Sequence, residues 1–299
     1  MKQFIIITIC ILLCTSVFAQ TDTLIIINDR DTTYWRNSFS AGANFNQTSF
    51  SSNWKAGGQN SLALGMFLNT KFNYLKDKAS FDNDIQLLYG FLRNAGQDFR
   101  KNQDLMYLDS KYGYGLNDHW NAFVSANFIS QFASGYKYAE NNASQDVLIS
   151  NFMAPAFLTF ALGVEYKPEP WFSLRLSPFA PRFTFLFDEA VGINERYGVP
   201  VGSNSRTELL AALLQADFDR EIFPNFNLKF TYQGFANYET LSFRTIDHRL
   251  NAIISATVNR FISMNLTCLM IYDLDQDDKA QFSQGLGLGL VYNVQNYKD

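Results

Sequence analysis

The stretch QGLGLGLVYNV, residues 284–294, alternates glycine with leucine at a strict period of two. A nucleotide-binding loop instead spaces its glycines as G-x-G-x-x-G, at a turn that opens a helix. A period of two is typical of an extended strand, because successive side chains of a strand point to opposite faces. One face of this strand is apolar, carrying Leu286, Leu288 and Leu290. The other face is nearly bare, carrying Gly285, Gly287 and Gly289.

The same alternation recurs along most of the chain, in segments separated by polar, Gly-, Asn- or Pro-containing connections. Twelve segments follow it: 39–46, 62–74, 81–91, 104–116, 120–131, 158–166, 172–177, 210–219, 226–234, 249–258, 262–273 and 284–294. A soluble β-sandwich also alternates, but its strands usually span five or six residues, whereas membrane-crossing strands need about nine to eleven. The length of these segments therefore favours membrane strands.

The connections between the segments alternate between short and long. Asp77-Lys78, Asn117-Asp118 and Pro224-Asn225 are short turns, and the intervening connections are longer. Short periplasmic turns, long outer loops and an even number of strands describe an outer-membrane barrel. The sequence thus predicts an all-β protein, a transmembrane antiparallel up-and-down β-barrel of about 12 strands. In this barrel the leucines of the opening stretch face lipid, and its glycines face the lumen, where they relieve crowding or let the sheet curve.

The N-terminus carries an export signal. Lys2 precedes an apolar run and the small-residue sequence Val17-Phe18-Ala19, which together form a secretory signal peptide. We expect cleavage near Ala19, which removes Lys2 and takes the formal net charge from -4 to -5. The predicted organisation is a signal peptide over 1–19, a periplasmic segment over 20–36 and an outer-membrane barrel over 37–299.

The composition excludes several classes of function. Cleavage removes two of the three cysteines and leaves Cys268, so the mature chain has neither an internal disulfide nor a cysteine-based metal site. The acidic balance and the lack of a basic cluster argue against nucleic acid. Aromatic residues are abundant, with 29 Phe and 15 Tyr against 17% charged residues, and the aromatic girdles of a membrane barrel account for them. No cofactor is expected.

A family resemblance supports the barrel. The stretch SFSAGANFNQTSFSSNWKAGGQNSLALG, residues 38–65, and above all its NWKAGGQNS core, resembles an uncharacterised outer-membrane family of Bacteroidota, domain of unknown function 3078. The likeness extends through LSPFAPRFTF, residues 176–185. The resemblance implies a barrel and a host with two membranes, and it carries no known activity.

Charges of both signs have inward parity on the predicted strands. The ten candidate lumen residues are Lys71, Asp82, Asp84, Asp109, Lys111, Glu165, Arg175, Asp217, Lys229 and Arg249, and Asp219 has the same inward parity. Opposite charges on neighbouring strands, such as Lys71 with Asp82 or Asp84 and Lys229 with Asp217, can meet across a ladder. Complete pairing would plug the barrel, whereas unpaired charges and the space left by inward glycines would favour an open path. A twelve-stranded ring lies between filled and open barrels, so size does not decide.

The first outer loop contains a candidate recognition element, made of Trp54, Lys55, Gly57, Gly58 and Gln59. An equal alternative is that the glycines shape the turn and Trp54 anchors at the membrane interface. The acidic loop 273–278 lacks the turn glycine and final glutamate of a calcium-binding hand, and a solvated outer loop is the better interpretation.

Catalytic machinery is not evident, and we expect no enzyme. His248 has outward parity near the outer rim, where a lipid-directed base would lie, but Leu250 occupies the position of the simplest serine partner. We interpret His248 as a residue at the membrane interface, and we interpret His119, beside Trp120, in the same way.

The sequence is compatible with two functions from different classes. The first is a narrow channel for small polar solutes or ions. The second is a plugged barrel that acts as a structural scaffold or as a subunit of an envelope complex, and an outer-membrane lipid hydrolase is a distant third. The expected partners are outer-membrane lipid, lipopolysaccharide, the barrel-insertion machinery and, for a channel, a small polar solute.

Overall fold

The computed structural model describes residues 34–51, 55, 59–139, 146–194, 196–259 and 261–296. The predicted signal peptide and most of the predicted periplasmic segment lie outside these residues. The compact unit that contains the strands spans Tyr34–Asp299. Its long strands are β1 (Trp35–Thr48), β2 (Ser61–Lys76), β3 (Ala79–Asn94), β4 (Arg100–Gly115), β5 (Trp120–Ser130), β8 (Ala156–Glu169), β9 (Phe172–Phe179), β12 (Ala211–Phe223), β13 (Phe226–Asn237), β14 (Ile246–Thr257), β15 (Ile262–Tyr272) and β16 (Gln281–Gln295).

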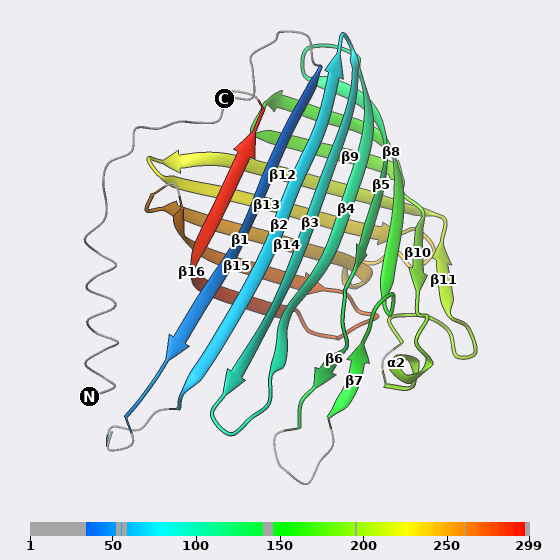
Figure 1. Cartoon of the computed structure of the whole chain (residues 1–299). Coiled ribbons are helices and arrows are strands. Elements are labelled where there is room, and N and C mark those ends of the chain that lie inside the picture. The colour runs from blue at the N-terminus through cyan, green and yellow to red at the C-terminus, as the bar shows by residue number, and fades with distance from the viewer. Residues whose placement is uncertain are drawn as a thin grey trace. The chain divides into compact units, whose positions relative to one another are not determined.

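These twelve strands close into one antiparallel ring. The order around it is β8, β5, β4, β3, β2, β1, β16, β15, β14, β13, β12 and β9, and β9 pairs back onto β8. The first and last strands meet between Ser38↔Gln295 and Phe45↔Leu288. In Figure 1, β1 to β4 form the front wall and β12 to β15 cross behind them. Closure matters because an open sheet edge would leave backbone donors and acceptors unsatisfied in lipid. The predicted twelve-stranded barrel is confirmed.

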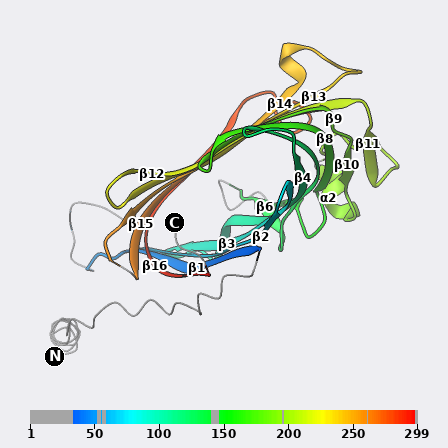
Figure 2. The ribbon, with the colours of Figure 1, turned by 90° about the horizontal axis from the view of Figure 1, so that it is seen from above.

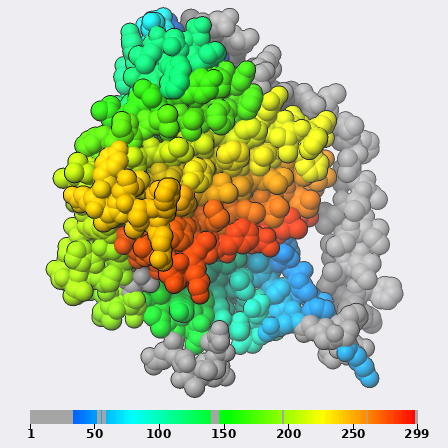
Figure 3. Space-filling model, turned by 180° about the vertical axis from the view of Figure 1, so that it is seen from behind, coloured from blue at the N-terminus to red at the C-terminus, as the bar shows by residue number. Residues whose placement is uncertain are grey.

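The outer surface of the ring is apolar. On β16, Leu286, Leu288 and Leu290 are 59%, 59% and 64% exposed, and comparable apolar side chains continue around the other strands. Figure 3 shows the barrel from behind, where the side chains of β12 to β15, coloured yellow to orange, form one continuous wall. A lipid-facing apolar belt on a closed ring is the exterior of a transmembrane barrel.

Aromatic side chains border this belt at the end of the strands that carries the short turns. Near the short turns, Trp35 packs on Tyr74 and Trp120 on Tyr166, with ring centroids 5.2 and 5.0 Å apart. Trp171, in the turn between β8 and β9, packs edge-on against Phe218. These rings lie where a membrane–water interface would cross the barrel wall.

The connections alternate as the sequence indicated. Turns of two to four residues follow β2, β4, β8, β12 and β14, and longer segments follow β1, β3, β5, β9, β13 and β15. No helix in the described part of the chain is long and apolar enough to cross a membrane. We refer to the side of the long connections as the outer end and to the side of the short turns as the inner end.

The connection between β13 and β14 contains the 3-10 helix η1 (Phe243–Thr245), and two longer connections contain strands of their own. Between β5 and β8 lies a small hairpin, β6 (Gly135–Lys137) with β7 (Val147–Ser150). Between β9 and β12 lie β10 (Arg182–Phe185), the short helix α2 (Glu189–Asn194) and β11 (Ser205–Glu208). β10 pairs with both β8 and β11, so it continues the direction of β9 past Ala180 and Pro181. Figure 2, seen from above, shows β10, β11 and α2 at one side of the ring.

These connections form a compact outer lobe, residues 147–155 and 186–203. Its core contains Ala154, Leu186, Val191 and Val199, with Tyr197 packed against it. The Tyr197 hydroxyl donates to the Ile149 carbonyl at 2.6 Å and joins the two connections. The lobe gives the outer end of the barrel a fixed structure beyond the ladder of β8.

Asp188 begins helix α2 and ties it to the other half of the lobe. The Asn151 amide donates to its carboxylate at 2.7 Å, and the backbone N–H groups of Ala190 and Val191 donate to it as well. The hydrogen bond from Asn151, followed by those two backbone bonds, lowers the pKa of Asp188 below its usual value. The carboxylate therefore stays ionised through the physiological range.

Candidate functional site

The interior of the barrel is lined by a network of ion pairs. All ten predicted lumen residues lie on strands of the ring, and nine have an ion-pair partner there. The pairs are Lys71–Asp219, Lys111–Asp82, Lys111–Glu165, Arg175–Asp109, Arg175–Glu165, Arg175–Asp217 and Lys229–Asp84. The tenth, Arg249, forms no ion pair within the described part of the chain. The structure therefore gives neither complete pairing nor a lumen of free charges.

The buried part of this network lies along β4, β8 and β9. Glu165 accepts from Lys111 Nζ at 2.5 Å and from the Asn121 amide at 3.2 Å, and its side chain is 3% exposed. Arg175 Nη1 donates to Asp109 at 2.7 Å, and its guanidinium lies 6.0 Å from the Phe123 ring centroid. Gly163 lies beneath the backbone of Leu176 and Ser177, so a Cβ at this position would collide with β9. The absence of that side chain lets β9 approach β8 closely.

A second part of the network crosses the lumen and forms a charge quartet of Lys71, Asp84, Asp219 and Lys229. Lys71 and Asp84 are directly opposed on β2 and β3, and Asp219 and Lys229 on β12 and β13. The ion pairs run between the walls instead, Lys71–Asp219 at 3.4 Å and Lys229–Asp84 at 4.0 Å. β2 lies opposite β12 in the ring, and β3 lies opposite β13. A single pair of side chains therefore spans the lumen between the two walls.

The quartet differs from the predicted pairing. The sequence allows Lys71 to meet Asp82 or Asp84, and Lys229 to meet Asp217, along the ladder. In the structure Asp82 pairs with Lys111, and Asp217 lies 4.0 Å from Arg175 and accepts from Thr231. Lys71 and Lys229 thus reach acids on the opposite wall of the narrow lumen. Lys111 and Asp82, which are directly opposed on β4 and β3, do pair along the ladder.

The inward glycines do not leave the empty space that the sequence suggested. A Cβ on Gly65 or Gly90 would lie 3.2 Å from the Gln103 side chain, and one on Gly287 would lie 3.1 Å from Asn44 Cβ. Gln103 and Asn44 therefore occupy the room that these glycines provide. Gln103 has the same parity as Tyr107 on β4, and this parity would have identified it as a lumen residue. The predicted strand, however, begins at residue 104.

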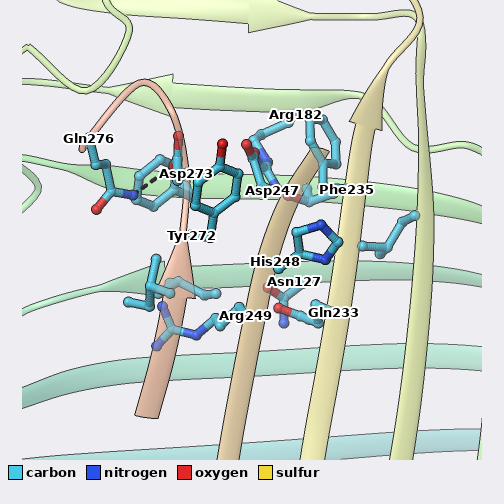
Figure 4. Close-up of a pocket in the computed structure, with 15 residues that line it drawn as sticks. Asn127, Arg182, Gln233, Phe235, Asp247, His248, Arg249, Tyr272, Asp273 and Gln276 are labelled. Atoms are coloured by element: carbon cyan, nitrogen blue, oxygen red, sulfur yellow. Dashed lines mark hydrogen bonds and ion pairs between the residues drawn. The ribbon is translucent and has the colours of Figure 1, made fainter. Parts of the chain in front are cut away.

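A cavity opens in the outer half of the lumen (Figure 4). It has a volume of about 70 Å³, and its walls combine apolar, amide and charged side chains from β5, β8, β10, β12, β13, β14 and β15. Arg182 and Asp247 lie at one end of it and Arg249 at the other. Arg182 Nη1 donates to Asp247 at 2.6 Å, and its guanidinium lies 3.3 Å from the Phe235 ring centroid.

A smaller cavity lies next to the first. It has a volume of about 20 Å³ and is lined by Gln86, Leu105, Tyr107, Thr231 and Asn251, together with Gln233 and Arg249. The last two residues also line the larger cavity. Arg249 thus stands between the outer cavity and the ion-pair network deeper in the lumen. Sequence reasoning missed Arg182 and Asp247, although Asp247 has the parity of Arg249 on β14.

The mouth of the barrel is bridged by one further ion pair. Arg206 of β11 pairs with Asp275 in the acidic loop between β15 and β16, and with Glu208 at 3.1 Å. Asp273 in this loop accepts from the Asp275 N–H and the Gln276 amide, at 2.9 and 2.7 Å. Among the described residues, no group of three or more His, Cys, Asp or Glu side chains is arranged to hold a metal ion.

The predicted recognition loop is only partly described. Trp54, Gly57 and Gly58 lie outside the described residues. Lys55 is exposed, and the Gln59 amide donates to the Ala95 carbonyl at 3.0 Å, which ties the first outer loop to the second. The candidate site is the lumen with its charged side chains.

The two histidines lie in aromatic surroundings. His248 Nδ1 lies 2.7 Å from the Tyr232 hydroxyl, and its ring is flanked by Tyr232 and Tyr272 at 6.1 and 6.2 Å between centroids. His119 meets Tyr166 edge-on. His248 also lines the larger cavity, and His119 lies in the short turn before β5.

Part of the chain matches a protein-family model. A family model described as "Protein of unknown function (DUF3078)" matches residues 45–136. No curated protein matches the sequence.

Solved structures similar to this chain are bacterial barrels. The COG4313 outer membrane channel from Pseudomonas putida F1 is 9% identical, with a TM-score of 0.38 over 87% of this chain and 94% of that one. The translocator domain of autotransporter NalP from Neisseria meningitidis is 11% identical, with a TM-score of 0.34 over 88% and 90%. The outer membrane channel DcaP of Acinetobacter baumannii is 12% identical, with a TM-score of 0.29 over 87% and 96%. At such low identity, the function has to be argued from the lumen itself.

Proposed function

We propose that this protein is an outer-membrane β-barrel that forms a narrow channel for small polar solutes or ions. The supporting observation is water access to the ion pairs in the lumen. Lys71 and Asp219 are 36% and 42% exposed, and Asp82, Asp84, Asp217 and Lys229 are between 24% and 31% exposed. A lumen filled by packed side chains would bury these groups, as it buries Glu165 and Lys111. Partly exposed charges of both signs instead line an aqueous path.

The charge quartet is the constriction of this path. Its four side chains come from opposite walls, and each ion pair closes part of the section between them. Because ion pairs that water reaches are held by about 1 kcal/mol or less, thermal motion separates Lys71 and Asp219, the more exposed pair, readily. The quartet therefore restricts passage at low energetic cost, and a change in its charges alters conductance.

The proposed location is the outer membrane of a bacterium with two membranes, after cleavage near Ala19. An apolar exterior belt flanked by aromatic side chains and an N-terminal export signal support this location. Lipid and lipopolysaccharide are the proposed surroundings, and the barrel-insertion machinery is the proposed assembly partner. The aromatic surroundings of His248 support a function without catalysis.

Current recording in planar bilayers tests the channel. The full chain is folded in detergent, its folding is checked by heat-modifiable gel migration, and wild type is compared with the double variant Lys71→Gln/Asp219→Asn, which leaves the net charge unchanged. We expect small wild-type currents and a larger single-channel conductance in the variant. Lys78→Gln, in the exposed β2–β3 turn, is the control and should match wild type.

The alternative is a plugged barrel that serves as scaffold or complex subunit, and the ion pairs that bridge the two walls favour it. Folded wild type and folded double variant that both stay silent in the bilayer would contradict the channel and support the plug. A conducting variant beside a silent wild type would assign the closure to the quartet.

A further inference from the structure

Two guanidinium groups with spare hydrogen-bonding capacity line the larger cavity. Arg249 has no ion-pair partner among the described residues, unlike the nine other predicted lumen charges. Arg182 is held by Asp247, but its Nε is buried and has no acceptor in the described part of the chain. Buried donors usually find acceptors, and guanidinium groups suit planar carboxylates in particular.

The acidic side chains around this cavity are already engaged. Asp247 accepts from Arg182, and Asp273 accepts from the Asp275 N–H and the Gln276 amide. Neither carboxylate therefore neutralises Arg249. The end of the cavity at Arg249 consequently favours an anion over a cation.

The remaining walls define the rest of the ligand. Ile129, Phe157, Leu213 and Ile271 give apolar surface, and Asn127 and Gln233 give amide groups. Apolar walls with a few convergent polar groups are typical of sites for small organic molecules. A phosphate ion, with oxygens on all sides, would leave oxygens unpaired against the apolar walls, whereas a carboxylate has its apolar part on one side.

The volume limits the size of the ligand. One water molecule needs roughly 10–15 Å³, so a cavity of about 70 Å³ has room for a small organic molecule. A short aliphatic carboxylate is of that size. We propose that the outer half of the lumen contains a binding site for short-chain monocarboxylates, with Arg249 as the carboxylate ligand and the apolar walls around the chain. This rests on the proposed channel and names its solute class.

Binding of butyrate to the folded full-length barrel tests the site directly. Isothermal titration in detergent compares butyrate with 1-butylamine, 1-butanol and inorganic phosphate. We expect butyrate to bind more tightly than the other three. Arg249→Gln should weaken butyrate binding about tenfold or more, because it removes a charge-assisted pair. Arg249→Lys should recover part of the affinity, since a point charge remains without the planar fork.

The control is Arg244→Gln, which removes the same charge from an exposed position in the β13–β14 loop and should leave butyrate binding unchanged. Butyrate binding that is equal in wild type and Arg249→Gln would overturn the site. So would tighter binding of phosphate or butylamine than of butyrate. An absence of butyrate binding to folded wild type would overturn it as well.

Current recording keeps this outcome separate from that of the channel proposal. Butyrate binding that depends on Arg249 in a protein without conductance would retain the site and remove the channel. Conductance that butyrate neither carries nor blocks, in a protein that does not bind it, would retain the channel and remove the site.

Discussion

Glu165 is the residue whose replacement best tests the buried part of the ion-pair network. Its side chain and that of Lys111 are 3% and 4% exposed, and their charged atoms lie 2.5 Å apart. Glu165→Gln keeps the shape and removes the charge. Removing one partner of a buried pair costs about 3–5 kcal/mol, because the other charge stays buried without compensation. Lys111 retains Asp82 at 3.2 Å and Arg175 retains Asp109 at 2.7 Å, which places the cost at the low end, about 3 kcal/mol.

Asp219→Asn is the matched comparison. It also converts a paired carboxylate in the lumen to an amide, but Asp219 and Lys71 are 42% and 36% exposed and 3.4 Å apart. Exposed pairs contribute about 0–1 kcal/mol. The two variants should therefore differ by about 2 kcal/mol or more, which is a factor of about 30 in the unfolding equilibrium constant.

Urea unfolding in lipid vesicles, followed by tryptophan fluorescence and heat-modifiable migration, measures both variants. Urea is preferable to guanidinium because it leaves ion pairs unscreened. The double variant Glu165→Gln/Lys111→Met should lose less than the sum of the two single losses, because contacting residues are energetically coupled. If Glu165→Gln lost no more stability than Asp219→Asn, the assignment of a buried network beside a solvated quartet would be wrong.

Three further predictions concern the wall, the topology and the outer lobe. Leu288→Arg, on the lipid face, should cost about 2–4 kcal/mol if it lies at the bilayer midplane, whereas Asn227→Arg beside Asp219 should cost much less; equal losses of folding yield would refute the facing of the strands. In a Cys268→Ser background, Val201→Cys in the outer lobe should react with an impermeant thiol reagent on whole cells and Asp77→Cys in an inner turn should not, and the reverse labelling would invert the barrel. The pKa of Asp188 is lower in the folded lobe than in an unfolded chain. Its contribution to stability is therefore full above the usual pKa of about 3.9 and is lost as the pH falls through the pKa of the folded state. The protection of the lobe against proteolysis should hold from pH 7 to 5 and fall in stronger acid, and Asp188→Asn should remove that dependence on pH.

The sequence determined the facing of the strands and their number. A strand reverses its side chains at every residue, so the alternation around Leu286 and Gly285 assigns each side chain to one face without knowledge of any neighbour. The positions of the twelve strands and the inward direction of the charges followed from this local rule. Because a soluble β-sandwich alternates as well, the length of the strands and the alternation of short and long connections indicated the membrane barrel.

Tertiary structure decided which inward groups meet. Lys71 pairs with Asp219 across the lumen, although Asp84 is its neighbour on the ladder, because the distance between opposite walls depends on the section of the closed ring. Tertiary structure also decides which side chains fill the space beside the inward glycines. Gln103 of β4, for example, lies next to Gly65 and Gly90. The period of the sequence gives the direction of each side chain but not these distances. The contacts of a side chain depend on the distance between its own wall and the facing wall of the barrel.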